Sequence, residues 1–246
     1  MSKRSKTAKR HGRLWKDRGH SEEYKFNAIF NRRKEGLNYS GASADCLVDK
    51  QIAKKLRVLR VAGNSVSLKS GSTNTFHLGN CAELSNKSTF KRSLRRKRVN
   101  GKWATCGTHG VSWCKQQNTL RSRSFWKNYL GNKGSFYVQL DKDSKTYVFF
   151  SMRDVVRFIC NRTKWSLLKT GRIKGSLFKK LNSGINKEYN VLTFEYRPGK
   201  HNNFALGAQS GKNGHRFYEI LKQNIPHIAL DDTRRLVRRT LFPRRS

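Results

Sequence analysis

The spacing of apolar residues predicts a helix close to the N-terminus. From Ser21, apolar side chains recur near helical spacing as far as Phe30. Ser21 is a suitable N-cap, and Glu22 and Glu23 fall in the first turn, where acids favour the helix dipole. Gly36 is expected to end this helix.

Period-2 alternation predicts strands in most of the remaining chain. Val66 and Leu68 alternate with polar residues between Asn64 and Lys69, as in a half-buried strand. Apolar runs on both sides of the turn-forming residues 141–144 indicate a hairpin. Residues 52–61 fit a helix at first and a strand later, so both interpretations remain open. Strands are expected at 46–48, 64–69, 135–140, 146–150, 165–168, 191–196 and 204–206, and further helices at 152–160, 214–225 and 231–246.

The positive charge of the chain is the strongest indication of its partner. Its 246 residues contain 54 Lys and Arg against 15 Asp and Glu, a formal charge of +39. Such self-repulsion weakens a compact fold unless a polyanion neutralises it, and nucleic acid does so with release of counterions. No apolar run approaches the roughly 20 residues that span a bilayer, and the N-terminus has no export signal. We therefore expect a nucleic-acid partner, no membrane, and a cytoplasmic, nucleoid or nuclear location without secretion.

These patterns together predict an α/β or α+β fold with a mixed central sheet, flanking helices and basic tails at both termini. We expect a disordered arm over residues 1–19, one nucleic-acid-binding domain over 20–230, and a basic helix or tail over 231–246. The basic loop 85–102 is a candidate subdomain boundary. The expected phosphate contacts are Lys91, Arg92, Arg95, Arg96, Lys97, Arg98, Arg172, Lys174, Arg197 and Lys200.

Residues 20–71 contain the candidate chemistry. Phosphodiester hydrolysis uses a metal ion, Mg²⁺ prefers carboxylate oxygens, and a nearby lysine stabilises the charge of the transition state. The order of a helical Glu, a strand Asp and a strand-borne Lys resembles the PD-(D/E)xK nuclease superfamily, which includes type II restriction endonucleases. The resemblance implies that Asp45 binds Mg²⁺ and that Lys69 is the lysine. It makes Glu23 or Glu22 the acid of the preceding helix.

The motif departs from the family pattern at two positions. Ala44 stands where proline is common, and Ser67 stands two residues before the lysine, where an Asp or Glu is expected. The resemblance then requires the helical glutamate to replace the missing metal ligand. The alternative is that Asp45 caps a turn and Lys69 contacts phosphate at the surface.

Two other groups of residues are weaker candidates. Glu195 and Arg197, on an expected strand, form a second pair of an acid and a base, which a structural ion pair also explains. Cys81, Cys106, His109 and Cys114 are the residue types of a structural Zn²⁺ site, with His77 as a further ligand, but no paired Cys-x-x-Cys accompanies them. Reduced thiols beside tryptophans explain the same cysteines without a metal.

The sequence therefore predicts a Mg²⁺-dependent endonuclease that cleaves double-stranded DNA. A two-fold dimer would suit cleavage of both strands. The competing prediction is a non-catalytic RNA- or DNA-binding protein, such as a ribonucleoprotein component or a viral packaging protein. The size of the positive charge and the serine at position 67 favour this alternative.

Overall fold

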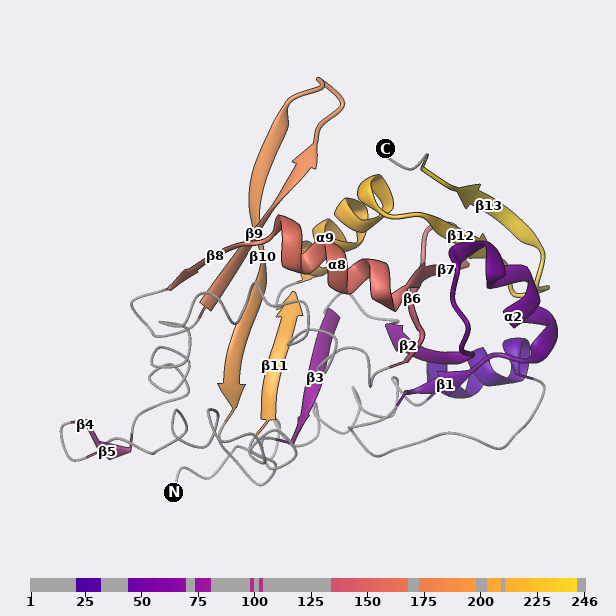
Figure 1. Ribbon diagram of the computed structural model, residues 1–246, viewed down its shortest axis with the longest axis horizontal. Coiled ribbons are helices and arrows are strands. Elements are labelled where there is room, and N and C mark those ends of the chain that lie inside the picture. The colour runs from indigo at the N-terminus through magenta and orange to yellow at the C-terminus, as the bar shows by residue number, and fades with distance from the viewer. Residues whose placement is uncertain are drawn as a thin grey trace.

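The computed structural model describes residues 21–31, 44–69, 74–80, 98–99, 102–103, 134–167, 173–197, 203–208 and 211–242. Within them the strands form a six-stranded sheet, a five-stranded sheet and a separate two-stranded pair. Helices accompany both larger sheets (Figure 1). The mixed α/β architecture expected from the sequence is confirmed.

The six-stranded sheet has the order β1-β2-β6-β7-β12-β13. Only the β2–β6 contact is parallel, and the other neighbours are antiparallel, so the sheet is mixed. Residues 135–151 form the expected hairpin. The strands are β1 (Cys46–Leu47), β2 (Ser65–Lys69), β6 (Phe136–Asp141), β7 (Thr146–Ser151), β12 (His227–Leu230) and β13 (Leu236–Thr240).

The five-stranded sheet is antiparallel throughout, in the order β3-β11-β10-β9-β8. Its β9–β10 hairpin projects beyond the rest of the described chain as a two-stranded ribbon (Figure 1). The strands are β3 (Asn74–Asn80), β8 (Lys164–Leu167), β9 (Ile173–Lys180), β10 (Asn186–Arg197) and β11 (Asn203–Ala208); the separate pair is β4 (Arg98–Val99) and β5 (Lys102–Trp103).

Alternating side chains of the six-stranded sheet enter two hydrophobic cores. On one face, Phe136 and Phe149 join the first core, which a helix at residues 21–30 and the helix α2 (Lys50–Leu56) complete. On the other face, Tyr137 and Phe150 join the second core. This period of two is the one that the sequence predicted for half-buried strands.

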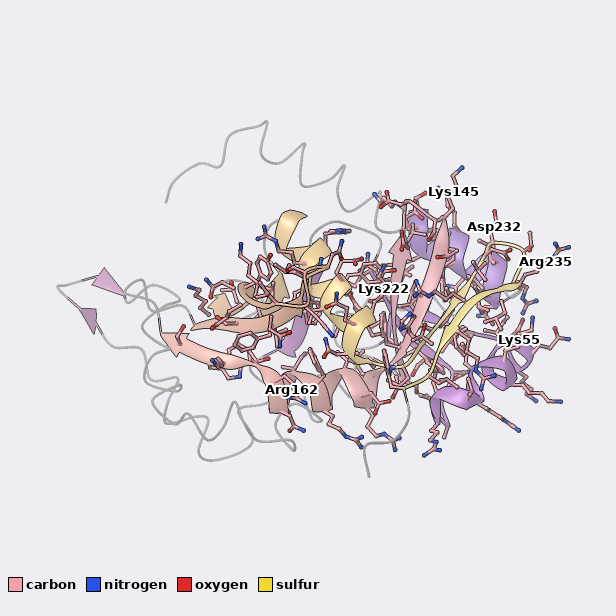
Figure 2. The ribbon with its side chains drawn as sticks, turned by 90° about the horizontal axis from the view of Figure 1, so that it is seen from above. Lys55, Lys145, Arg162, Lys222, Asp232 and Arg235 are labelled. Carbon is pink, nitrogen blue, oxygen red and sulfur yellow. The ribbon has the colours of Figure 1, made fainter. Side chains whose placement is uncertain are left out.

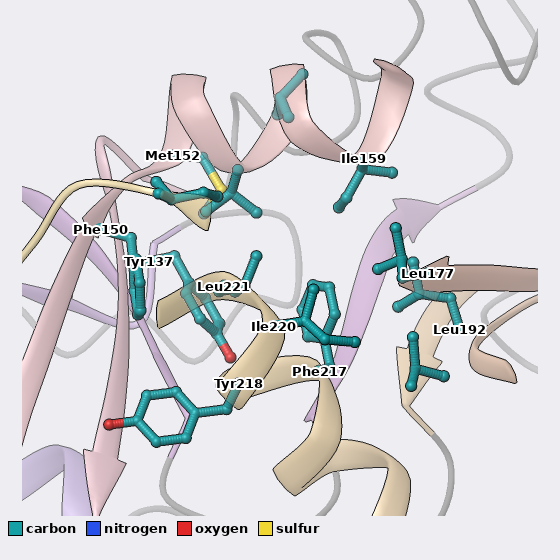
Figure 3. Packing of buried hydrophobic residues seen from close by; sticks show 14 of the residues in the cluster. Tyr137, Phe150, Met152, Ile159, Leu177, Leu192, Phe217, Tyr218, Ile220 and Leu221 are labelled. Carbon is teal, nitrogen blue, oxygen red and sulfur yellow. The ribbon is translucent and has the colours of Figure 1, made fainter. Parts of the chain in front are cut away.

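The second core lies between the two sheets. Helices α8 (Met152–Arg162) and α9 (Gly211–Asn224) supply much of it, and Leu177 and Leu192 enter from β9 and β10. Figure 3 shows Met152 of α8 and Phe217 and Leu221 of α9 pointing into this shared interior. Both helices were expected from the sequence. They connect the two sheets into one packed unit.

The prediction of a C-terminal helix is wrong. Asp231 instead closes a turn, because its carboxylate accepts hydrogen bonds from the Arg235 N–H at 2.8 Å and the Thr233 hydroxyl at 2.8 Å. The chain reverses there, and β13 pairs with β12 at the edge of the sheet. Leu236 and Val237 are 55% and 56% exposed, so these side chains do not pack against the core as the apolar face of an amphipathic helix would.

Three further segments differ from or refine the expectations. β9, which includes Lys174, and β3, which includes His77, both lie outside the strands expected from the sequence. Residues 52–61 resolve into α2 followed by the 3₁₀ helix η1 (Arg57–Leu59), which Arg60 ends in a left-handed conformation with φ of 56°. None of the described helices has the length and apolar character needed to cross a membrane.

Candidate acid–lysine site on the six-stranded sheet

The helix at residues 21–30 distinguishes between the two candidate glutamates. Glu22 pairs with Lys25 one turn along the helix, at 3.3 Å. Glu23 lies against β1, since its backbone carbonyl accepts a hydrogen bond from the Cys46 thiol at 3.8 Å. One turn further, Asn27 accepts from the Leu47 N–H at 3.4 Å. The face of the helix that carries Glu23 therefore contacts the edge of the sheet.

Asp45 and Lys69 meet as the sequence predicted. One carboxylate oxygen of Asp45 accepts hydrogen bonds from the Leu68 N–H at 2.9 Å and the Ser67 hydroxyl at 3.2 Å. The Lys69 ammonium lies 3.3 Å from the same oxygen. The neighbours Cys46, Val66 and Leu68 enter the first core, so alternation places Asp45, Ser67 and Lys69 together on the opposite face.

The Glu23 carboxyl lies close enough to this pair to be perturbed by it. Burial and, to a smaller extent, the negative charge of Asp45 raise the pKa of Glu23 from 4.5 to about 7, against the opposing effect of the Lys69 charge. Within the described part of the chain, no hydrogen bond or ion pair compensates the Glu23 carboxylate. Glu23 consequently exchanges a proton near neutral pH. We call Glu23, Asp45, Ser67 and Lys69 the acid–lysine site.

The neighbouring thiol of Cys46 plays no part in this exchange. Burial raises the pKa of Cys46 strongly, and the charges of Asp45 and Glu23 act in the same direction. Cys46 is a free, buried cysteine that remains protonated. Its role is in packing of the first core and in the contact with the Glu23 carbonyl.

The donor atoms of the site suit a hard divalent cation with an incomplete protein shell. The described residues contain no group of three or more Asp, Glu, His or Cys side chains placed to hold a metal. Mg²⁺ does not need such a group, because it retains several waters and uses one or two carboxylates together with substrate phosphates. Glu23 and Asp45 are two such carboxylates. Ser67 donates its hydroxyl to the Asp45 carboxylate, so it fixes the orientation of one of the two acids.

The turn of the β6–β7 hairpin forms a second group of charges. The Asp141 carboxylate accepts from the Tyr218 hydroxyl at 2.8 Å and lies 3.8 Å from the Lys222 ammonium. Lys222 also pairs with Glu219 at 2.8 Å. Burial opposes ionisation of Asp141, but the Tyr218 hydrogen bond, N–H groups of the turn and Lys222 together lower its pKa. We call Asp141, Tyr218, Glu219 and Lys222 the turn cluster.

A group of cations on α2 and η1 was not foreseen. Lys50, Lys54, Arg57 and Arg60 line an open depression of about 560 Å³. The first three recur at positions i, i+4 and i+7, a helical spacing visible in the sequence. The ambiguity between helix and strand over residues 52–61 concealed this spacing.

The structure places only some of the other expected residues. Lys174 lies in β9 with a partly exposed side chain, Arg98 begins β4, and Arg197 ends β10, which also contains Glu195. The remaining expected phosphate contacts and the Zn²⁺ candidates lie outside the described residues: Lys91, Arg92, Arg95, Arg96, Lys97, Arg172, Lys200, Cys81, Cys106, His109 and Cys114.

Comparison with known proteins adds no relative. The chain matches no family model, and no curated protein or solved structure shows significant similarity to it.

Proposed function

We propose that the protein is a Mg²⁺-dependent endonuclease that cleaves double-stranded DNA at the acid–lysine site. The observation that carries the proposal is that Glu23, Asp45 and Lys69 come together from a helix, a strand entrance and a second strand, and that the pKa of Glu23 is about 7. Perturbed acids beside a lysine are typical of catalytic sites. The net charge of +39 supplies the attraction for a polyanionic substrate.

Each residue of the site has a distinct role in this proposal. Glu23 and Asp45 would hold Mg²⁺, which supplies polarisation of the phosphate and a more acidic water. The hydroxyl of Ser67 and the N–H of Leu68 fix the orientation of Asp45. The Lys69 ammonium, 3.3 Å from Asp45, stabilises the negative charge that develops on the phosphate.

The setting of this activity follows from the same features. An intracellular location fits the free thiols of Cys46 and Cys160. A homodimer would bring one acid–lysine site to each strand of a duplex. Both statements rest on the proposed reaction.

A non-catalytic nucleic-acid-binding protein is the second candidate. The ion pair between Lys69 and Asp45 favours it, because the lysine already neutralises one of the two acids. Ser67 favours it too, since the site has one acid fewer than the family pattern. In this case Asp45 serves the fold through its hydrogen bonds to β2.

Cleavage of duplex DNA by the purified full-length chain separates the two candidates. We expect discrete fragments in Mg²⁺ and none in excess chelator. Asp45→Asn, Lys69→Met and Glu23→Gln should each lose cleavage while retaining salt-sensitive DNA binding. Binding without cleavage in either Mg²⁺ or Mn²⁺ would refute the nuclease and leave the binding protein.

Glu22→Gln is the matched control. It removes the same charge from the same helical turn, but Glu22 pairs with Lys25 and not with the acid–lysine site. We expect wild-type cleavage from this variant. Equal losses in Glu22→Gln and Glu23→Gln would show that the variants act through general charge and not through the site.

A further inference from the structure

The basic depression on α2 and η1 combines four positive charges with an apolar floor. Lys50, Lys54, Arg57 and Arg60 line it, together with the smaller side chains of Ala53 and Val61. All four basic residues are exposed. No carboxylate contributes to its lining. The depression is therefore selective for anions.

The four cations are not neutralised by the described part of the protein. None of the ion pairs or side-chain hydrogen bonds within it engages them. Like charges one helical turn apart, as Lys50 and Lys54 are, destabilise a helix. This arrangement is unfavourable in isolation and becomes favourable when an extended anion spans the row.

The helix that carries these cations is held firmly in place. Asp49 accepts a hydrogen bond from the Ile52 N–H at 2.9 Å as N-cap and forms an ion pair with Arg234. Lys55 donates to the Arg234 carbonyl at 2.9 Å, and Ile52 is buried in the first core. A fixed support lowers the entropy lost when the cations order around a ligand.

We propose that the basic depression binds the phosphodiester backbone of DNA without regard to sequence. Cations position a nucleic acid through its phosphates, whereas sequence is read by groups that reach base edges. The lining offers only positive charges and small apolar side chains, without the Asn or Gln that reads adenine, which favours contact with phosphates. This inference rests on the nucleic-acid partner of the proposed function, but not on cleavage.

The depression is close to the acid–lysine site along the chain. Five residues separate Lys50 from Asp45, and five fully extended residues span at most about 18 Å. Duplex DNA advances about 3.4 Å per nucleotide on each strand, so Lys50 lies within about five nucleotides of a phosphate at Asp45. The contacted backbone would flank the bond to be cut.

The test measures DNA binding of the full chain against salt in the presence of chelator. Replacing Lys50, Lys54, Arg57 and Arg60 by Gln should reduce the slope of log affinity against log salt by about three to four, since each phosphate contact contributes about 0.9. The control replaces Lys142, Lys145, Arg153 and Arg162 by Gln. These are also exposed, and Lys145 and Arg162 lie well apart from Lys55 of α2 (Figure 2).

We expect less than half of that slope change from the control. Equal changes in the two quadruple variants, or an unchanged slope in the first, would overturn the inference. Arg57→Gln alone, with an expected change of about one, replaces the quadruple variant if the latter does not fold. Because no metal is present, a failed nuclease assay leaves this result unaffected.

Discussion

The acid–lysine site and the turn cluster each contain two carboxylates and one lysine, but the charges are compensated differently. In the turn cluster, Lys222 contacts both acids, and Tyr218 donates a further hydrogen bond to Asp141. In the acid–lysine site, Lys69, Ser67 and a backbone N–H all converge on Asp45. Glu23 is left with a carboxylate that burial and Asp45 disfavour.

This difference distinguishes charges that the protein itself compensates from a carboxylate that an added cation would stabilise. The low pKa of Asp141 means that the folded state already stabilises its charge. The high pKa of Glu23, about 7, means that the folded state does not, and that an added cation would. Similar residue types therefore compensate each other within the fold in one place and, under the proposed function, accommodate a cation in the other.

The largest expected effect distinguishes the two clusters by activity. If the proposed function holds, Asp45→Asn should reduce Mg²⁺-dependent cleavage at least about 100-fold, because it removes a proposed metal ligand. Asp141→Asn should leave the rate per folded molecule within about threefold of wild type, since the partners of its carboxylate among the described residues are N–H groups of the turn, Tyr218 and Lys222. Single-turnover cleavage of a labelled duplex measures both. Equal losses would remove the functional distinction between the clusters.

The second effect is on stability, and here the larger loss is expected in the turn cluster. Asp141→Asn should lower the free energy of unfolding by about 1–3 kcal/mol, because Tyr218 and Lys222 lose a charged partner. Urea unfolding at pH 7 measures the change. Asp143→Asn, in the same turn but exposed, should cost less than about 0.5 kcal/mol. A similar cost for both variants would mean that the turn, and not the cluster, responds.

The third effect is a gain of stability at the acid–lysine site. The pKa of Glu23 is higher in the folded protein than its ordinary value of 4.5, so its contribution is favourable at low pH and is lost as pH rises through about 7. Without metal at pH 8, Glu23→Gln should therefore raise the free energy of unfolding by about 1–2 kcal/mol, a value reduced for screening by solvent.

The pH dependence supplies the check on that gain. The advantage of Glu23→Gln should diminish as pH falls and vanish well below pH 4.5, where wild-type Glu23 is protonated in both the folded and the unfolded state. Glu22→Gln, measured in parallel by thermal unfolding, should show no comparable gain. A destabilised Glu23→Gln at pH 8 would contradict the raised pKa.

The smallest effect concerns metal affinity. Under the proposed function Mg²⁺ would have to displace the proton of Glu23, so its apparent affinity should fall about fivefold between pH 7 and pH 6. Isothermal titration calorimetry measures this fall, and Glu23→Gln should bind more weakly with little pH dependence. An affinity independent of pH in the wild type would exclude Glu23 as a ligand.

The part of the site that could be predicted depends on local geometry. The resemblance to the nuclease motif proposed Asp45 and Lys69 as a pair, and alternation is consistent with it, because side chains of a strand repeat every two residues and Lys69 shares a face of β2 with Ser67. The choice between Glu22 and Glu23 could not be made in this way. It depends on how the helix at residues 21–30 rotates against β1, which the packing of Phe26 and Asn27 determines.

The parts of the fold that were missed depend on long-range pairing. The sequence of the C-terminal strand has the spacing of an amphipathic helix. It forms a strand because the hydrogen bonds of Asp231 close a turn that reverses the chain. The basic and glycine residues of β9 are typical of a loop. Its strand conformation comes from pairing with β8 and β10. Such pairing overrides local propensity.

The parallel contact between β2 and β6 has a consequence for the order of events during synthesis. Val66 of β2 pairs with Phe136 of β6, and Ile228 and Leu230 of β12 complete the first core. The strands that carry Asp45 and Lys69 thus leave the ribosome long before the partners that bury them. The first core, which supports the acid–lysine site, is therefore complete only after β12 has left the ribosome. A chain interrupted before β12 would contain Asp45 and Lys69 without the full core that holds them in place.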